Sequence, residues 1–69
     1  MTVDTKRLIG KIYENGYNRS SFADELGISR ETLRKYIKNP ASMPYTVIEK
    51  AISILHLNSE EAKDIFFAE

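Results

Sequence analysis

The sequence predicts an all-α domain of five short helices. Apolar residues recur at helical spacing in five segments, and no segment shows the alternation of apolar and polar residues that is typical of a strand. Residues that cap helices, such as Asn, Ser and Gly, border most of these segments. The chain has 69 residues, no repeat and no linker, so residues 1–69 are expected to form one domain.

The first helix is predicted from about Thr5 to Glu14. It should end at Asn15-Gly16, which is typical of a left-handed helix end. The second is predicted from about Arg19 to Leu26, because Asn18 is a good N-cap and Gly27 stops a helix. The first helix has its apolar residues at helical spacing, namely Leu8, Ile9, Ile12 and Tyr13.

The third helix is predicted from about Arg30 to Lys38, with Ser29 as its N-cap. Glu31 lies in its first turn and Lys35 in its last, as the helix dipole favours. Pro40 and Pro44 stand together in NPASMP, which marks the clearest break in the chain.

The fourth helix should begin near Pro44, a residue suited to a first turn. The fifth should open with a capping box made by Asn58 and Glu61. The fourth helix is expected to bury a stripe of apolar residues made of Ile48, Ala51, Ile52 and Leu55. The fifth is expected to bury Ala62, Ile65 and Phe66.

The joint between the second and third helices is short, since only Gly27-Ile28-Ser29 separates them. Such a joint makes two helices cross steeply, and Ala23 is small enough for the point of closest approach. Gly27 can take the positive φ that a larger residue resists. The polar side of the third helix then points away from the core, as a helix in a DNA major groove requires.

Formal net charge is zero, but the two halves of the chain differ. Residues 1–38 hold eight Lys and Arg against five acids, whereas residues 39–69 hold two against five. The front half is therefore basic. This uneven distribution of charge favours a polyanionic partner, although the net charge of zero does not.

The short joint and its surroundings hold a set of small and apolar residues at fixed spacing, namely Ala23, Gly27 and Leu33, together with Phe22, Leu26, Ile28 and Tyr36. In these residues the chain resembles the helix-turn-helix domains of phage repressors and Cro-like proteins. The resemblance covers residues 19–38, and its flanks RLIGKI and DIFFAE are similar to small phage Cro-type or repressor-modulating proteins. It implies a lambda-repressor-like fold and a sequence-specific DNA-binding regulator of transcription, of phage or prophage origin, acting on a double-stranded operator.

The expected DNA contacts lie in and beside the third helix, about residues 30–38. Two positions depart from the usual pattern of the resembling family, since Arg19 and Glu31 stand where glutamine is common. Ser29, the N-cap of the third helix, is expected to belong to the same DNA-contacting surface. Bases should face Arg30, Glu31, Arg34 and Lys35, and phosphates should face Arg19, Thr32 and Lys38.

A single helix-turn-helix makes a small contact with DNA, so two copies, or one copy and a partner repressor, are expected on adjacent half-sites. Phe66 and Phe67 are neighbours on a helix and cannot both face the core. Phe67, together with Val47 and Ile54 off the main stripe of the fourth helix, is the expected contact for a homodimer or partner.

Several classes of function are not expected. With no cysteine and a single histidine, His56, in a predicted loop, the chain lacks the ligands of a zinc site, and no cofactor is predicted. Convergent catalytic groups are absent, so the chain is not expected to be an enzyme. The start of the sequence has no apolar run like that of a signal peptide, and no segment could span a bilayer, so a cytoplasmic location in a bacterial host is expected.

One alternative stays open at this point. The same fold could act as an antirepressor or modulator that binds a partner repressor protein, as the resemblance also implies. The near-zero net charge favours this alternative slightly, while the basic third helix favours DNA.

Overall fold

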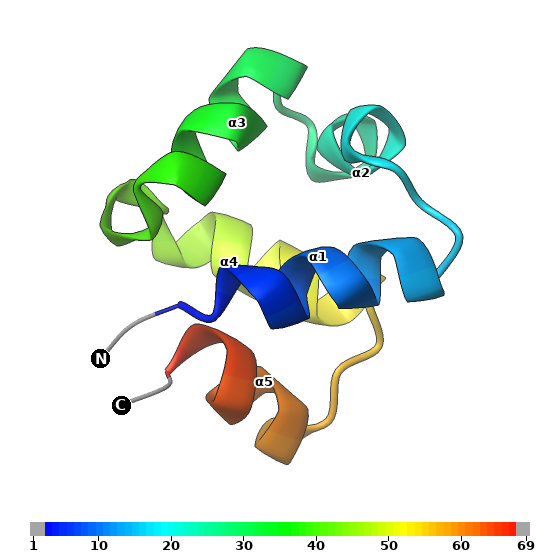
Figure 1. The fold of residues 1–69 in the computed structure, drawn as a ribbon, viewed down its shortest axis with the longest axis vertical. Helices are drawn as coiled ribbons and strands as arrows, with labels where there is room; N and C mark the ends of the chain where they lie inside the picture. The colour runs from blue at the N-terminus through cyan, green and yellow to red at the C-terminus, as the bar shows by residue number, and fades with distance from the viewer. Residues whose placement is uncertain (1–2, 68–69) are drawn as a thin grey trace.

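Residues 3–67, the part of the chain that this computed structural model describes, contain five α-helices and one short 3-10 helix joined by short turns (Figure 1). No strand occurs within these residues, which confirms the predicted all-α class. The elements are α1 (Thr5–Glu14), α2 (Arg19–Leu26), α3 (Arg30–Lys38), η1 (Pro40–Ser42), α4 (Tyr45–Ile54) and α5 (Ser59–Phe66).

The predicted bounds of α1, α2 and α3 are confirmed, and two details around the prolines differ. The NPASMP segment was predicted only as a break, yet Pro40 opens η1, since its fixed φ suits the first position of a helical turn. Pro44 was expected in the first turn of α4, but it is the N-cap, with extended backbone, and the helix begins at Tyr45.

Side-chain caps explain where most helices begin. Asp4, Asn18, Ser29 and Asn58 each accept a hydrogen bond from the backbone N–H three residues later. The predicted capping box of α5 is confirmed, because Glu61 Oε1 also accepts from the Asn58 N–H at 3.2 Å. A second capping box opens α2, where a serine, Ser21, takes the place that glutamate usually holds.

Three helices end in the same hydrogen-bonded turn, the Schellman motif, in which a residue with positive φ is followed by an apolar residue. Gly16 and Gly27 hold this position after α1 and α2, with φ of 83° and 76°. His56 holds it after α4, with φ of 53°, and its side chain is exposed. The bonds that close the turns run from the N–H groups of Tyr17, Ile28 and Leu57 to the carbonyls of Ile12, Ala23 and Ile52, each at 3.0 Å.

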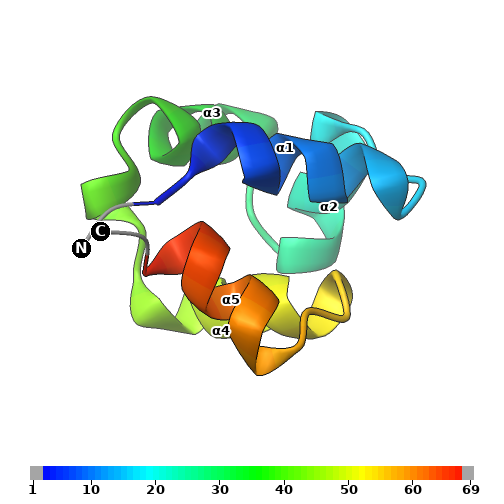
Figure 2. The same ribbon diagram turned by 60° about the horizontal axis from the view of Figure 1, so that its bottom comes forward.

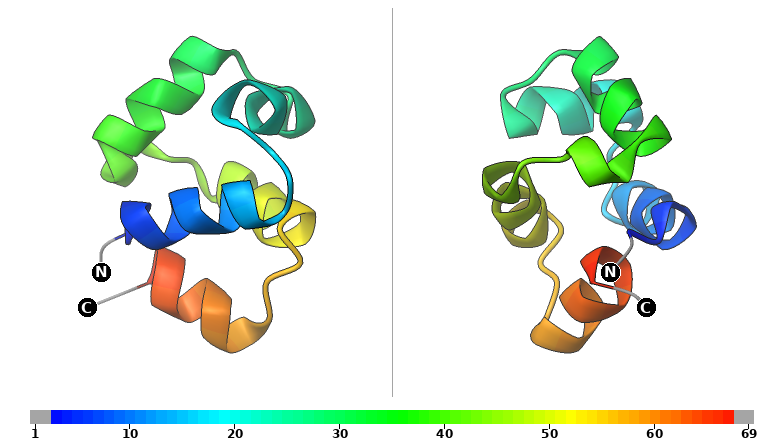
Figure 3. Two further views of the ribbon diagram at one scale, coloured as in Figure 1. Left: turned by 45° about the vertical axis from the view of Figure 1, so that its right-hand side comes forward. Right: turned by 90° about the vertical axis from the view of Figure 1, so that its left-hand side faces the viewer.

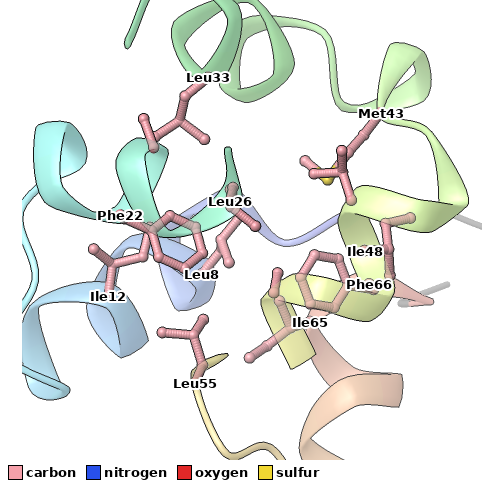
Figure 4. Packing of buried hydrophobic residues seen from close by; sticks show 13 residues of the cluster. Leu8, Ile12, Phe22, Leu26, Leu33, Met43, Ile48, Leu55, Ile65 and Phe66 are labelled. Carbon is pink, nitrogen blue, oxygen red and sulfur yellow. The ribbon is translucent and has the colours of Figure 1, made fainter. Parts of the chain in front are cut away.

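A single apolar cluster joins all five helices (Figure 4). α1 and α5 are also tied by a backbone hydrogen bond of 2.6 Å from the Asp4 N–H to the Ile65 carbonyl. α3 and α5 lie at opposite ends of the molecule, as three views agree (Figures 1, 2 and 3). The largest fully buried side chains are Phe22, Phe66, Leu8, Ile12 and Leu33.

The buried side of α4 differs from the predicted stripe. Val47, expected off the stripe and available for a contact between proteins, is only 9% exposed and belongs to the core, whereas Ile52 is partly buried. Spacing alone locates a helix face to within about one residue, and packing against α2 and the apolar side chains of α5 selects a stripe shifted toward Val47. Val47 is therefore a core residue.

None of the described helices could cross a lipid bilayer. The longest have ten residues, about half the length that a membrane span needs.

We expect Gly27→Ala to lower the free energy of unfolding by about 1–2 kcal/mol, because an L-residue other than glycine resists the left-handed conformation. No atom lies within 4 Å of the position that a Cβ would take, so the loss comes from the backbone alone. Urea denaturation followed by far-UV circular dichroism measures it.

The matched control is Gly10→Ala within α1, where a Cβ also meets nothing within 4 Å and φ is not positive. Alanine favours a helix interior, so this variant should be more stable than the wild type by about 0.5–1 kcal/mol. Equal shifts in the two variants would contradict the assigned role of Gly27.

Candidate nucleic-acid interface

α2, the three-residue turn and α3 pack together as one unit. Gly27 supplies the left-handed residue, and Ile28 packs against the core from the turn. Ala23 is 1% exposed, and its carbonyl accepts the hydrogen bond from the Ile28 N–H. In Figure 1, α2 is seen nearly end-on while α3 runs across the view, so the two helices cross steeply. Gly27 and Ile28, the turn residues that the sequence predicted, therefore set the orientation of α3 relative to α2.

α3 is anchored by one side and leaves the other side to solvent. Leu33 is 1% exposed, and Tyr36 and Ile37 are partly buried against the core. Four cations and one carboxylate stand within its nine residues. All five of these side chains are exposed, namely Arg30, Glu31, Arg34, Lys35 and Lys38.

The structure brings a residue of α2 into this surface. Arg19, the first residue of α2, lines a concave site together with Arg30 and Arg34 of α3. Glu31 lines the same site, with the buried Leu33 at its base. Lys35 and Lys38 lie further along α3 and do not line it. We call the exposed set of Arg19, Arg30, Glu31, Arg34, Lys35 and Lys38 the basic face.

The ion pairs found within residues 3–67 all lie on the side of α1 and α5. Arg7 pairs with Asp4 at 3.3 Å and with Asp64 at 3.9 Å. Lys11 pairs with Glu14 at 3.5 Å and with Glu61 at 2.6 Å. Three of the eight cations of the basic front half, Lys6, Arg7 and Lys11, are thus not part of the basic face, and Arg7 and Lys11 are already paired with carboxylates.

The Lys11–Glu61 pair is the firmest of these contacts. Its hydrogen bond raises the pKa of Lys11, and the same bond, with the Asn58 N–H as a second donor, lowers the pKa of Glu61. Both side chains therefore keep their charges over a wider pH range than they would separately. No such carboxylate partner occurs within the described residues for any cation of the basic face.

Ser29 and Thr32, which were predicted within the DNA-contacting set, shape the start of α3. Ser29 Oγ accepts a hydrogen bond from the Thr32 N–H at 3.1 Å, and the two hydroxyl oxygens lie 2.8 Å apart. Thr32 is partly buried, whereas Ser29 is exposed. Their hydroxyls hold the N-terminal end of α3 in place, next to Arg30 and Glu31.

The residues predicted for a contact between proteins are not together on one exposed patch. Val47 is buried, and Ile54 is partly buried against the core. Phe66 is 2% exposed, whereas Phe67 is only partly buried and packs against the core, so the prediction that one of the two phenylalanines is partly exposed is confirmed. Phe67 lines a second concave site, which is apolar.

The chain matches the model of the family described as "Protein of unknown function (DUF739)" over residues 1–69. No curated protein and no solved structure matches the chain. The family match spans the whole chain, so it includes both the α2–α3 unit and the apolar site.

Proposed function

We propose that this chain, which belongs to the DUF739 family, is a sequence-specific DNA-binding regulator of transcription of the phage repressor and Cro type. The observation that carries the proposal is the basic face, where a steep helix-turn-helix joint places Arg19 beside Arg30 and Arg34. Its place of action is the cytoplasm of a bacterial host, on the DNA.

The width of the B-DNA major groove, about 12 Å, admits one α-helix. α3 is suited to enter it because its cations project from an exposed side, while Leu33 fixes the opposite side to the core. Arg30 and Arg34 are one helical turn apart and have the forked donors that pair with guanine O6 and N7. Glu31 accepts hydrogen bonds and suits a cytosine amine.

Arg19 and Lys38 have a different role in the proposal. Arg19 approaches from α2 and Lys38 ends α3, so the two flank the base-reading residues at opposite ends. Cations at such positions contact phosphates, which fixes the orientation of the helix on the duplex without reading sequence.

The proposal predicts a strong salt dependence. About four to six phosphate contacts for each half-site should give a slope near −4 to −5 in a plot of log binding constant against log salt concentration, because bound counterions are released from DNA. Lys38→Gln should make that slope about one unit shallower and leave sequence preference unchanged. Fluorescence titrations of labelled duplexes at several salt concentrations measure both.

Lys63→Gln is the matched control, since this exposed lysine lies on α5, at the other end of the molecule from α3. It should leave the slope unchanged. If instead no DNA binds at low salt, and a partner repressor is held with little sensitivity to salt, then the chain is a modulator that binds a protein, and the proposal is wrong.

A further inference from the structure

The basic face holds one carboxylate, that of Glu31. This residue lines the same concave site as three arginines, Arg19, Arg30 and Arg34, and its side chain is exposed. The basic face as a whole has five cations against this one acid. A negative charge weakens the attraction of such a surface to any polyanion, so Glu31 needs a role other than general affinity for DNA.

Glu31 makes no ion pair within residues 3–67, although three guanidinium groups line its site. Arg34 lies three residues further along the helix, a spacing at which opposite charges can meet. Glu61 of α5 is the contrast, since its carboxylate accepts hydrogen bonds from Lys11 and from the Asn58 N–H. No ion pair cancels the charge of Glu31, and its oxygens are available to a ligand.

Helix stability explains an acid at this position of α3 but not its surroundings. Glu31 is the second residue of α3, where a negative charge interacts favourably with the helix dipole. Glu60 has the same place in α5 and is also exposed, but it does not line the site of the three arginines. α5 lies at the other end of the molecule from α3 (Figure 1). The dipole therefore accounts for both acids, whereas only Glu31 stands where DNA is proposed to bind.

A carboxylate in the major groove distinguishes bases because it accepts hydrogen bonds and cannot donate them. Cytosine presents the N4 amine there, a donor, whereas guanine presents two acceptors, thymine presents an acceptor and a methyl group, and adenine presents an acceptor beside its amine. A carboxylate held against acceptors loses its water without gaining a hydrogen bond, and the phosphates on both sides of the groove repel it. Glu31 thus lowers affinity on most sequences, and a cytosine amine offsets that loss.

We infer that Glu31 is a specificity-determining residue of the basic face: its charge weakens binding to DNA of random sequence, and a cytosine amine in the operator relieves that loss. The inference rests on the proposed function and deepens it, because selectivity then comes from a repulsive group as well as from the attractive arginines. The half-site accordingly contains a C·G pair whose cytosine faces the second residue of α3.

Binding of Glu31→Gln to random DNA tests the repulsion. Glutamine has nearly the same shape and no charge, so at about 0.1 M salt the variant should bind random duplexes about three to ten times more tightly than the wild type. Its affinity for the selected operator should not rise, because the lost hydrogen bond to cytosine offsets the lost repulsion. Fluorescence anisotropy with the two duplexes measures the ratio of these affinities, which should fall; an unchanged ratio would overturn the inference.

Glu60→Gln is the matched control, since it makes the same change of charge at the same helix position, away from the basic face. It should leave the affinities for random DNA and for the operator unchanged. Both variants lose the interaction with a helix dipole, so their melting temperatures should fall alike. An equal gain of random-DNA binding in the two variants would assign the effect to net charge alone and overturn the inference.

Selection of duplexes from a random DNA library separates this inference from the proposed function. The wild type should select cytosine at one position of the half-site, and Glu31→Gln should prefer adenine there, because glutamine pairs with adenine N6 and N7. Both chains should select the guanines that face Arg30 and Arg34; their loss in the variant would show that Glu31 only positions the arginines, and would overturn the inference. If the wild type selects no sequence, the proposed function fails and the inference with it; if Glu31→Gln selects the same sequence as the wild type, the inference alone fails.

Discussion

Phe22→Ala should unfold most of the chain at 25 °C. Phe22 is 1% exposed, belongs to the core and has its ring centroid 6.0 Å from that of Tyr17, so it ties α2 to the turn that follows α1. Truncation of a buried phenylalanine costs about 3–5 kcal/mol. A core in a domain of this size rarely supplies more than about 3–5 kcal/mol in total. Far-UV circular dichroism in a urea titration measures the loss of helix and of stability.

Phe22→Leu is the matched control for this prediction. Leucine keeps an apolar side chain at the position and leaves a smaller cavity, so the variant should lose only about 1–2 kcal/mol and unfold cooperatively. An unfolding midpoint of Phe22→Ala equal to that of the wild type would show that this side chain does not hold the helix-turn-helix to the core.

Arg30→Ala and Arg34→Ala should each weaken binding to a selected DNA site by about 1–3 kcal/mol and have little effect on random DNA. Both side chains are exposed and line the concave site beside Arg19, so neither contributes to the core, and both variants should fold. Fluorescence anisotropy with the two duplexes at one salt concentration measures the difference. Equal losses on both duplexes would show that these arginines contact only the DNA backbone.

Arg34→Lys distinguishes charge from geometry at the same position. Lysine keeps the positive charge but lacks the planar fork that pairs with guanine through two hydrogen bonds. The variant should therefore keep the salt dependence of the wild type while losing sequence preference. If Arg34→Lys keeps the full sequence preference of the wild type, then Arg34 contributes only its charge.

Much of the fold could be predicted because the ends of the helices depend on local interactions. Asn18, Ser29 and Asn58 accept hydrogen bonds from N–H groups three residues away, and Gly27 permits a φ of 76°. These contacts lie within a few residues along the chain, so the sequence alone sets the bounds of α2 and α3 and the short turn between them. The side of α3 that packs against the core also follows from the sequence alone, because Leu33, Tyr36 and Ile37 recur at helical spacing.

His56 shows where a local signal was weaker. It occupies the left-handed position that glycine holds after α1 and α2, and only the apolar residue that follows it, Leu57, repeats the pattern of Tyr17 and Ile28. Histidine is among the residues that tolerate a positive φ better than most. The prediction therefore placed it in a loop without identifying its part in ending α4.

Other features were decided by residues far apart in the sequence. The rotation of α4 that buries Val47, the ion pairs of Arg7 and Lys11 with α5, and the approach of Arg19 to Arg30 all depend on how the helices pack. Periodicity gives each helix an apolar side but neither its neighbour nor its exact rotation. The sequence alone thus determined the helices and the basic character of α3, whereas tertiary packing decided which cations lack a carboxylate partner and which residue of α2 joins them.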